Sequence, residues 1–217
     1  MIQVKICGIN DPTSFDAVVD EGADFVGFVF FPPSPRAVSP AQAAALSARA
    51  NGGPKRVGLF VNPDDAAIAD VLGHIRLDAL QLHSCTVDRI AEIAARFGVP
   101  VWRAVGVSVA GDLPSAVHAD LLMLDAKAPA NANRPGGNAV VFDWSILAGW
   151  HKPGPWMLAG GLTPDNIAAA IAATGAPVVD VSSGVESAPG VKDPARIRAF
   201  IRAAKAVPTP IFARPAD

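Results

Sequence analysis

A lysine and a cysteine near the start of the chain are of types that can do proton chemistry. Lys5 and Cys7 have one residue between them in an apolar run that ends at Gly8. Because side chains alternate along a strand, both lie on one face if the run is extended. A lone cysteine is most often a small buried hydrophobic residue. A nearby cation, however, lowers the pKa of a thiol and favours the thiolate. Cys7 is therefore a candidate nucleophile or general base.

Other apolar runs carry polar residues in the same alternating pattern. These residues have aliphatic or aromatic neighbours at the positions between them, and they are Gln81, His83, Arg103, Asp125, Asp180 and Ser182. Buried charges are costly without partners, so we expect Lys5 and Arg103 to pair with the two aspartates. These polar residues form either a buried network of ion pairs with no catalytic role or part of an active site.

Two segments rich in glycine and serine could bind a phosphate group. Gly160 and Gly161 precede an expected helix, whereas Ser182, Ser183 and Gly184 end another apolar run. Backbone N–H groups in such turns, and at helix N-termini, bind phosphate. A Gly-Gly pair alone is common in turns. Two such segments together indicate a phosphorylated substrate.

The elements that carry these residues alternate between strand and helix. Strands are expected at residues 4–7, 25–30, 56–61, 79–83, 101–105, 121–125, 156–161 and 178–182. Helices are expected at residues 11–21, 39–50, 64–75, 86–97, 113–118, 143–150, 163–174 and 193–206. Eight such units predict an α/β fold of parallel strands, a single (β/α)8 TIM barrel over residues 1–207, with a proline-rich tail over 208–217. An open doubly wound sheet is the alternative.

In such a barrel the strand ends meet at the C-terminal mouth, where barrel enzymes carry their catalytic groups. Cys7 and Asp125 would lie there. The two glycine-containing segments would follow the last two strands, which is a frequent phosphate site of this fold. We expect long loops after the second and sixth strands to cover the mouth, the latter over residues 126–141.

Composition limits the class of protein. The chain has 217 residues, a net charge of −2 and 51% hydrophobic residues, which fits one domain with a sizeable core. The sequence has no basic cluster for nucleic acid and no apolar run long enough for a membrane. Two cysteines are too few for a disulfide framework, which favours a reducing, cytoplasmic location. We interpret Cys85 as a packing residue, and no closely spaced His/Cys set indicates a metal.

Together these segments resemble the phosphoribosylanthranilate isomerase family of tryptophan biosynthesis over nearly the whole chain. The most specific are residues 5–9 (KICGI), 34–36 (SPR), 81–83 (QLH), 124–125 (LD), 142–144 (FDW), 159–162 (AGGL) and 180–186 (DVSSGVE). The resemblance implies a barrel without cofactor or metal that acts on a small phosphoribosyl substrate, as a monomer or a homodimer. It further implies an Amadori rearrangement of N-(5-phosphoribosyl)anthranilate to 1-(o-carboxyphenylamino)-1-deoxyribulose 5-phosphate.

The resemblance also implies a role for each candidate residue. Asp125 would be the general acid that opens the ribose ring, and Cys7 the general base that removes the proton at C2. Arg36 would bind the anthranilate carboxylate, although by its spacing it could be an ordinary solvated loop arginine. Gln81, His83 and Asp180 would line the substrate site, and the phosphate would be held by Gly160, Gly161, Ser182, Ser183 and Gly184.

Two departures from the family pattern leave alternatives open. Residues 136–141 read GGNAVV where the family has a loop like GGTGK, and Ser84 replaces a glycine. The related histidine-pathway isomerase uses two aspartates for the same chemistry, and Cys7 argues against that family. A non-catalytic ligand-binding barrel is supported only by the altered loop, and retention of Cys7 and Asp125 argues against it.

Overall fold

Eight parallel strands close on themselves in sequence order in the computed structural model, which describes residues 1–128, 136 and 142–208. The strands are β1 (Gln3–Cys7), β2 (Phe25–Val29), β3 (Lys55–Val61), β4 (Ala79–His83), β5 (Val101–Val107), β6 (Leu121–Ala126), β7 (Trp156–Leu158) and β8 (Val178–Val181). Closure comes from β1, which pairs in parallel with both β2 and β8. The predicted TIM barrel is confirmed, and the open-sheet alternative is wrong.

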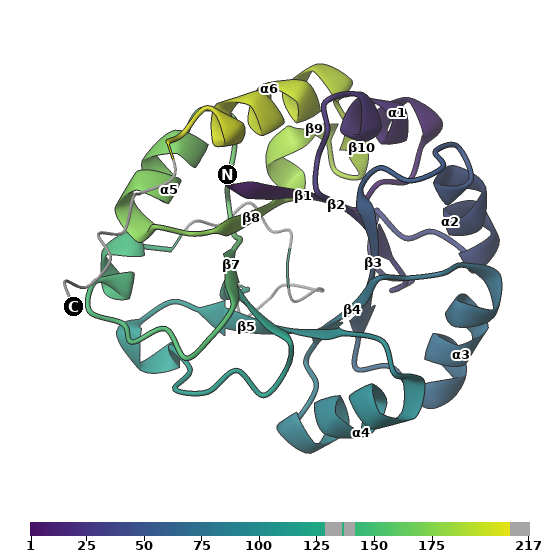
Figure 1. Ribbon diagram of the computed structural model, residues 1–217, viewed down its shortest axis with the longest axis horizontal. Helices are drawn as coiled ribbons and strands as arrows, with labels where there is room; N and C mark the ends of the chain where they lie inside the picture. The colour runs from purple at the N-terminus through teal and green to yellow at the C-terminus, as the bar shows by residue number, and fades with distance from the viewer. Residues whose placement is uncertain (129–135, 137–141, 209–217) are drawn as a thin grey trace, which may run out of the picture.

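The six α-helices of the described residues form an outer ring around the strands (Figure 1). In the described part of the chain they are α1 (Pro12–Asp20), α2 (Pro40–Ser47), α3 (Asp65–His74), α4 (Val87–Phe97), α5 (Ile167–Thr174) and α6 (Pro194–Lys205). Asp11 caps the start of α1, where its side chain accepts a hydrogen bond from Ser14 N at 2.9 Å. Of the helices described, none is long and apolar enough to cross a membrane.

Two of the expected helices are replaced by shorter 3₁₀ turns, η1 (Ala110–Asp112) and η2 (Trp144–Leu147). The helix predicted over residues 113–118 is wrong. Pro114 disfavours helical backbone at Leu113, and His118 has a φ of 51°, which ends any helix there. The carbonyl of Pro114 instead accepts a hydrogen bond from Trp150 Nε1 at 3.0 Å, which ties this segment to the one after β6.

A small hairpin that the sequence did not predict lies between β8 and α6. After β8 the chain makes a 3₁₀ turn, η3 (Ser183–Val185), and then two antiparallel strands, β9 (Glu186–Ala188) and β10 (Val191–Lys192). Residues 129–135 and 137–141 of the expected long loop, and the tail from residue 209, lie outside the described residues.

The prediction that Arg103 points into the barrel is wrong. On β5, Trp102 and Ala104 pack in the interior apolar cluster, so Arg103 lies on the opposite face. The expected ion pair of Arg103 is wrong, since none of its contacts within the described residues is an ion pair. The physical reason is on the outside of the barrel. Only the three-residue η1 follows β5, so the outer face of this strand is half exposed and accepts a charge.

Candidate active site

A pocket at the C-terminal mouth brings most of the predicted site residues together. Its walls include both predicted catalytic residues and all four predicted substrate-binding residues, namely Cys7, Arg36, Gln81, His83, Asp125 and Asp180, together with Ser182. Cys7 and His83 are the last residues of β1 and β4, and Asp125 is the next to last of β6. The parallel strands therefore place these three side chains at one end of the barrel.

A buried ion pair lies at the base of this pocket. Lys5 Nζ is 2.8 Å from Asp180 Oδ1, and the Lys5 side chain is fully buried. Burial alone would lower the pKa of Lys5, but the Asp180 carboxylate and Cys7 raise it above its ordinary value. Lys5 is therefore a fixed cation. The expected pairing of Lys5 is confirmed for Asp180, whereas no ion pair of Asp125 is seen within the described residues.

Cys7 lies beside this cation, yet its pKa is raised rather than lowered. A Cβ placed on Gly27 would be 3.0 Å from Cys7 Sγ and 3.1 Å from Lys5 Nζ, so both atoms surround the same point. Burial disfavours the thiolate and has the largest effect, and the Lys5 charge offsets it only in part. The expectation of a lowered thiol pKa is wrong for the free protein, because sequence cannot show how deeply a residue is buried.

Asp125 holds its proton near neutral pH. Burial, and to a smaller extent the nearby Asp180 carboxylate, raise the pKa of its carboxyl group to about 7. The hydrogen bond from the Ala126 backbone and the Lys5 charge offset these effects only in part. A carboxylic acid with this pKa can donate a proton at physiological pH, which an exposed aspartate cannot do.

Gln81 and His83 contact each other on the inner face of β4. The Gln81 side-chain Nε2 is 3.0 Å from His83 Nε2, and an amide nitrogen only donates, so His83 Nε2 accepts. Burial, and then the Lys5 charge, lower the pKa of His83 to about 4, so the imidazole is neutral. The Gln81 side-chain oxygen is buried and has no hydrogen-bond partner among the described residues, which makes it an acceptor at the pocket wall.

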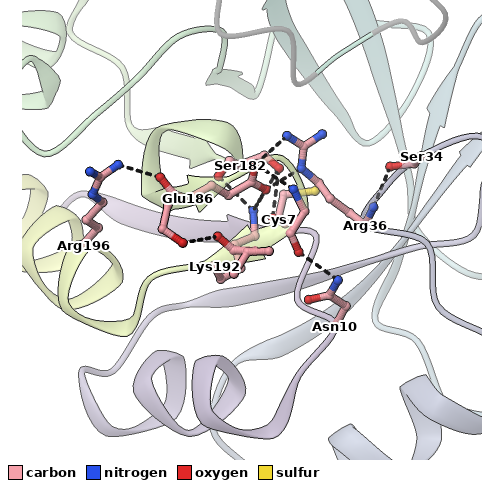
Figure 2. Close-up of polar contacts among 11 residues, drawn as sticks. Cys7, Asn10, Ser34, Arg36, Ser182, Glu186, Lys192 and Arg196 are labelled. Atoms are coloured by element: carbon pink, nitrogen blue, oxygen red, sulfur yellow. Dashed lines mark hydrogen bonds and ion pairs between the residues drawn. The ribbon is translucent and has the colours of Figure 1, made fainter.

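Arg36 is buried, which excludes the alternative that it is a solvated loop arginine. It is 3% exposed, and its guanidinium donates from Nε at 2.6 Å and from Nη2 at 2.9 Å to the two carboxylate oxygens of Glu186 (Figure 2). Gly8 lies beneath the side chain, since a Cβ there would be 2.7 Å from Arg36 Cδ. Arg36 is thus held between the end of β1 and the hairpin while it lines the pocket.

The two predicted phosphate-binding segments pack directly against each other. A Cβ on Gly184 would be 1.8 Å from the carbonyl oxygen of Leu162, so only glycine fits at this contact. Gly160 and Gly161 adopt φ values of 86° and 63°, which favour glycine. Ser182 donates from its hydroxyl to the carbonyl of Cys7 at 3.1 Å. The segments after β7 and β8 thus form one surface beside the end of β1.

Sequence reasoning gave no role to two buried charges near the site, Glu186 and Lys192. Lys192 Nζ lies 2.8 Å from Glu186 Oε1 and donates to the Ser182 carbonyl at 2.8 Å. Both are buried residues of the unpredicted hairpin. The sequence does contain an indication of this hairpin. Glu186 follows Val185 and Lys192 follows Val191, and Gly190 can form a turn between the two short segments.

Comparison with known proteins identifies the family of this chain. The family described as "N-(5'phosphoribosyl)anthranilate (PRA) isomerase" matches residues 4–203. The chain belongs to this family. A relative from Paracoccus denitrificans, named N-(5'-phosphoribosyl)anthranilate isomerase, is 56% identical over 210 residues, which are 94% of this chain and 98% of the relative. Members are isomerases of tryptophan biosynthesis, and so is this protein.

Solved structures of family members share the fold. The phosphoribosyl anthranilate isomerase of Thermotoga maritima superposes with a TM-score of 0.81 at 38% identity, covering 94% of this chain and 99% of that one. A second structure, with a TM-score of 0.81 at 37% identity and the same coverage, is described as a complex with reduced 1-(o-carboxyphenylamino)-1-deoxyribulose 5-phosphate. The predicted family and the predicted barrel are both confirmed.

Proposed function

We propose that this chain converts N-(5'-phosphoribosyl)anthranilate to 1-(o-carboxyphenylamino)-1-deoxyribulose 5-phosphate with Asp125 as general acid and Cys7 as general base. The observation that carries the proposal is that one pocket contains both the Cys7 thiol and the buried Asp125 carboxyl group, whose pKa is raised to about 7. The relative solved with the reduced product is in keeping with this reaction.

The first step opens the sugar ring. Asp125 gives its proton to the ring oxygen as the bond from that oxygen to C1 breaks, and the anthranilate nitrogen shares its lone pair with C1. The result is an open-chain iminium cation and an Asp125 carboxylate. The buried position of Asp125 favours this order, because the carboxyl group is neutral before the step and faces a cation after it.

The second step moves a proton from C2. The Cys7 thiolate removes it, and the electron pair of the C–H bond forms the C1–C2 double bond while the iminium nitrogen becomes neutral. The enolamine then gains a proton at C1 and loses its enol proton to yield the ketose. Burial raises the thiol pKa in the free protein, but the iminium cation favours the thiolate in the complex. The iminium serves as the electron sink.

The other pocket residues bind and orient the substrate. Arg36 binds the anthranilate carboxylate, for which a planar guanidinium is well suited. The Gln81 oxygen accepts a hydrogen bond from a sugar hydroxyl, neutral His83 orients Gln81, and Asp180 fixes Lys5 beside the thiol. The segments with Gly160, Gly161, Ser182, Ser183 and Gly184 hold the phosphate. Their close packing in the free protein means that little ordering is needed on binding.

The proposal also covers the extent of the catalytic domain, the oligomeric state and the cellular location. We propose residues 1–207 as the catalytic barrel domain and the proline-rich residues 208–217 as no part of that domain. The protein acts on its small substrate as a monomer or a homodimer in the cytoplasm. A relative from Thermotoga maritima is described both as dimeric and as generated monomers, which supports either state.

The proposal is tested by replacing the base and following the loss of substrate fluorescence. Cys7→Ala should lower kcat by about 10²–10⁴-fold, the usual contribution of general acid–base catalysis. Cys85→Ala is the matched control, because Cys85 is half exposed and does not line the pocket, and its kcat should equal that of the parent. A Cys7→Ala enzyme with parental kcat would reject Cys7 as the base.

The pH dependence of kcat/KM provides a second test. The active form needs a protonated Asp125, with a pKa of about 7, and an ionised Cys7, whose pKa is raised. Below pH 7 the thiolate fraction rises about tenfold per pH unit, so kcat/KM rises with it. Above pH 7 the loss of protonated Asp125 cancels that gain. We expect kcat/KM to rise up to about pH 7 and then level off until the thiol ionises. A decline that sets in at pH 7 would contradict the assignment.

A further inference from the structure

A buried charge cluster lies behind the wall of the pocket, on the side of the hairpin. Glu186 is its centre: besides Arg36, its carboxylate accepts from Lys192 Nζ at 2.8 Å and from Gly190 N at 3.2 Å. The three side chains of Arg36, Glu186 and Lys192 are all buried (Figure 2). The hydrogen bonds of Glu186 span 150 residues of sequence, from the loop after β2 to the hairpin after β8.

We propose that Glu186 is a positioning residue that makes the enzyme selective for a carboxylate on the aromatic amine of its substrate. It does so by holding the Arg36 guanidinium at the pocket wall, and Lys192 holds Glu186 in turn. The inference rests on the proposed function, in which Arg36 binds the substrate carboxylate. Glu186 does not line the pocket, so its effect on the substrate passes through Arg36.

The geometry fixes Arg36 before any substrate arrives. A long arginine side chain loses rotamer entropy when it is ordered, and this loss weakens substrate binding unless the side chain is already ordered in the free protein. Two bonds to Glu186 and the contact with Gly8 order the side chain here. The hairpin also supports the backbone, because a Cβ on Gly190 would be 2.5 Å from the carbonyl oxygen of Pro35, next to Arg36.

The charges of the cluster explain why Glu186 is shared between two cations. Burial alone would raise the pKa of Glu186, but the Arg36 hydrogen bond and the Lys192 charge lower it, so the carboxylate stays ionised. A carboxylate paired with Arg36 alone would neutralise it. Lys192 contacts the same carboxylate, so within the described residues Glu186 is shared between two basic side chains, and burial lowers the pKa of Lys192 against the opposing effect of the Glu186 charge.

The test compares two substrates that differ only in the carboxylate. Glu186→Gln keeps the size of the side chain and removes its charge. For N-(5'-phosphoribosyl)anthranilate we expect KM to rise about tenfold or more, the effect of losing a hydrogen bond between charged groups, with kcat unchanged. For N-(5'-phosphoribosyl)aniline, which lacks the carboxylate, KM should stay at the parental value.

A matched control removes a similar pair elsewhere. Asp16 accepts from Arg49 Nε at 2.9 Å and Nη2 at 2.6 Å, also in bidentate fashion, but on the surface. Asp16→Asn should leave KM for both substrates unchanged. If Glu186→Gln does not fold, as judged by its thermal melting, the double variant Glu186→Gln/Lys192→Met removes one charge of each sign. The double variant should show the same selective rise in KM.

Arg36→Met separates this inference from the proposed function. Loss of the preference for the carboxylated substrate in both Arg36→Met and Glu186→Gln supports the inference. Loss in Arg36→Met with retention in Glu186→Gln overturns the role of Glu186 alone. Retention in Arg36→Met overturns the proposed role of Arg36 itself. An equal rise in KM for both substrates in Glu186→Gln would show a general structural role and overturn the inference.

Discussion

Two layers of side chains inside the same barrel differ in character. The lower layer is apolar, lies for the most part in the first half of the strands, and consists of Phe25, Val57, Ala79, Trp102, Met123, Met157, Ala159 and Val178. The upper layer, near the strand ends, is polar and consists of Lys5, Cys7, Gln81, His83, Asp125 and Asp180. On three strands the change takes a single step of two residues, from Ala79 to Gln81, from Met123 to Asp125 and from Val178 to Asp180.

The difference shows how one fold separates stability from chemistry. The lower layer is packed without polar groups, so it closes the barrel to water beneath the site. Charges placed directly above it lie in a medium of low polarizability, and this burial raises the pKa of Asp125 to about 7 and lowers that of His83 to about 4. Substitutions in the upper layer should therefore cost activity, and those in the lower layer should cost stability.

The largest expected effect comes from Asp125→Asn in the upper layer. It should lower kcat by about 10²–10⁴-fold, because the amide has no acidic proton to give to the ring oxygen. Its stability should move the other way. Since the pKa of Asp125 is raised on folding, the folded protein holds a proton that the unfolded chain releases between about pH 4 and pH 7. Ionisation of this group therefore makes the parent less stable as the pH rises through that range.

Asparagine does not ionise, so the Asp125→Asn protein should melt at a higher temperature than the parent at pH 8. The gain should shrink at pH 4, where the aspartate is protonated in the folded parent. Thermal melts at the two pH values, together with turnover, check both parts. A variant that loses activity and also melts lower at pH 8 would mean that Asp125 stabilises the barrel, and the division between the layers would fail.

Trp102→Ala in the lower layer should show the opposite pattern. Trp102 packs edge-on against Phe25, with ring centroids 5.0 Å apart, and it is 7% exposed. Its truncation leaves a cavity in a closed layer and should reduce the free energy of unfolding by about 3–5 kcal/mol, measured by urea denaturation. The activity per folded molecule should remain near the parental value. A selective loss of kcat in a stable Trp102→Ala protein would show that the layers are coupled.

Much of the fold and of the pocket followed from sequence, because both depend on local patterns. Apolar runs that end at glycine and proline located the strands, and the alternation of side chains placed Lys5, Gln81, Asp125 and Asp180 inside the barrel. The same alternation failed at Arg103. The pattern alone does not say which face is inside, and the missing outer helix after β5 reversed the usual preference.

The properties that sequence did not predict depend on depth and on distant contacts. The pKa of Cys7 was expected to fall because Lys5 is two residues away, but burial is set by the whole barrel and has the larger effect. The partner of Arg36 is 150 residues away, in a hairpin whose strands have three and two residues, which is too short for a periodic pattern to reveal. Charge clusters of this kind become visible only when the chain is folded.

The smallest expected effect compares glycines at the two ends of the barrel. Gly8 follows β1 at the mouth with a φ of 78°, and Gly98 caps α4 at the other end with a φ of 61°. Alanine at either position adopts a left-handed conformation, which costs about 1–2 kcal/mol of stability. Nothing lies within 4 Å of a Cβ on Gly98, whereas a Cβ on Gly8 would be 2.7 Å from Arg36 Cδ.

Gly8→Ala must therefore also displace Arg36, so its KM for the carboxylated substrate should rise while that of Gly98→Ala stays unchanged. Equal KM values with equal losses of stability would show that Gly8 serves only the turn and that the position of Arg36 does not depend on it.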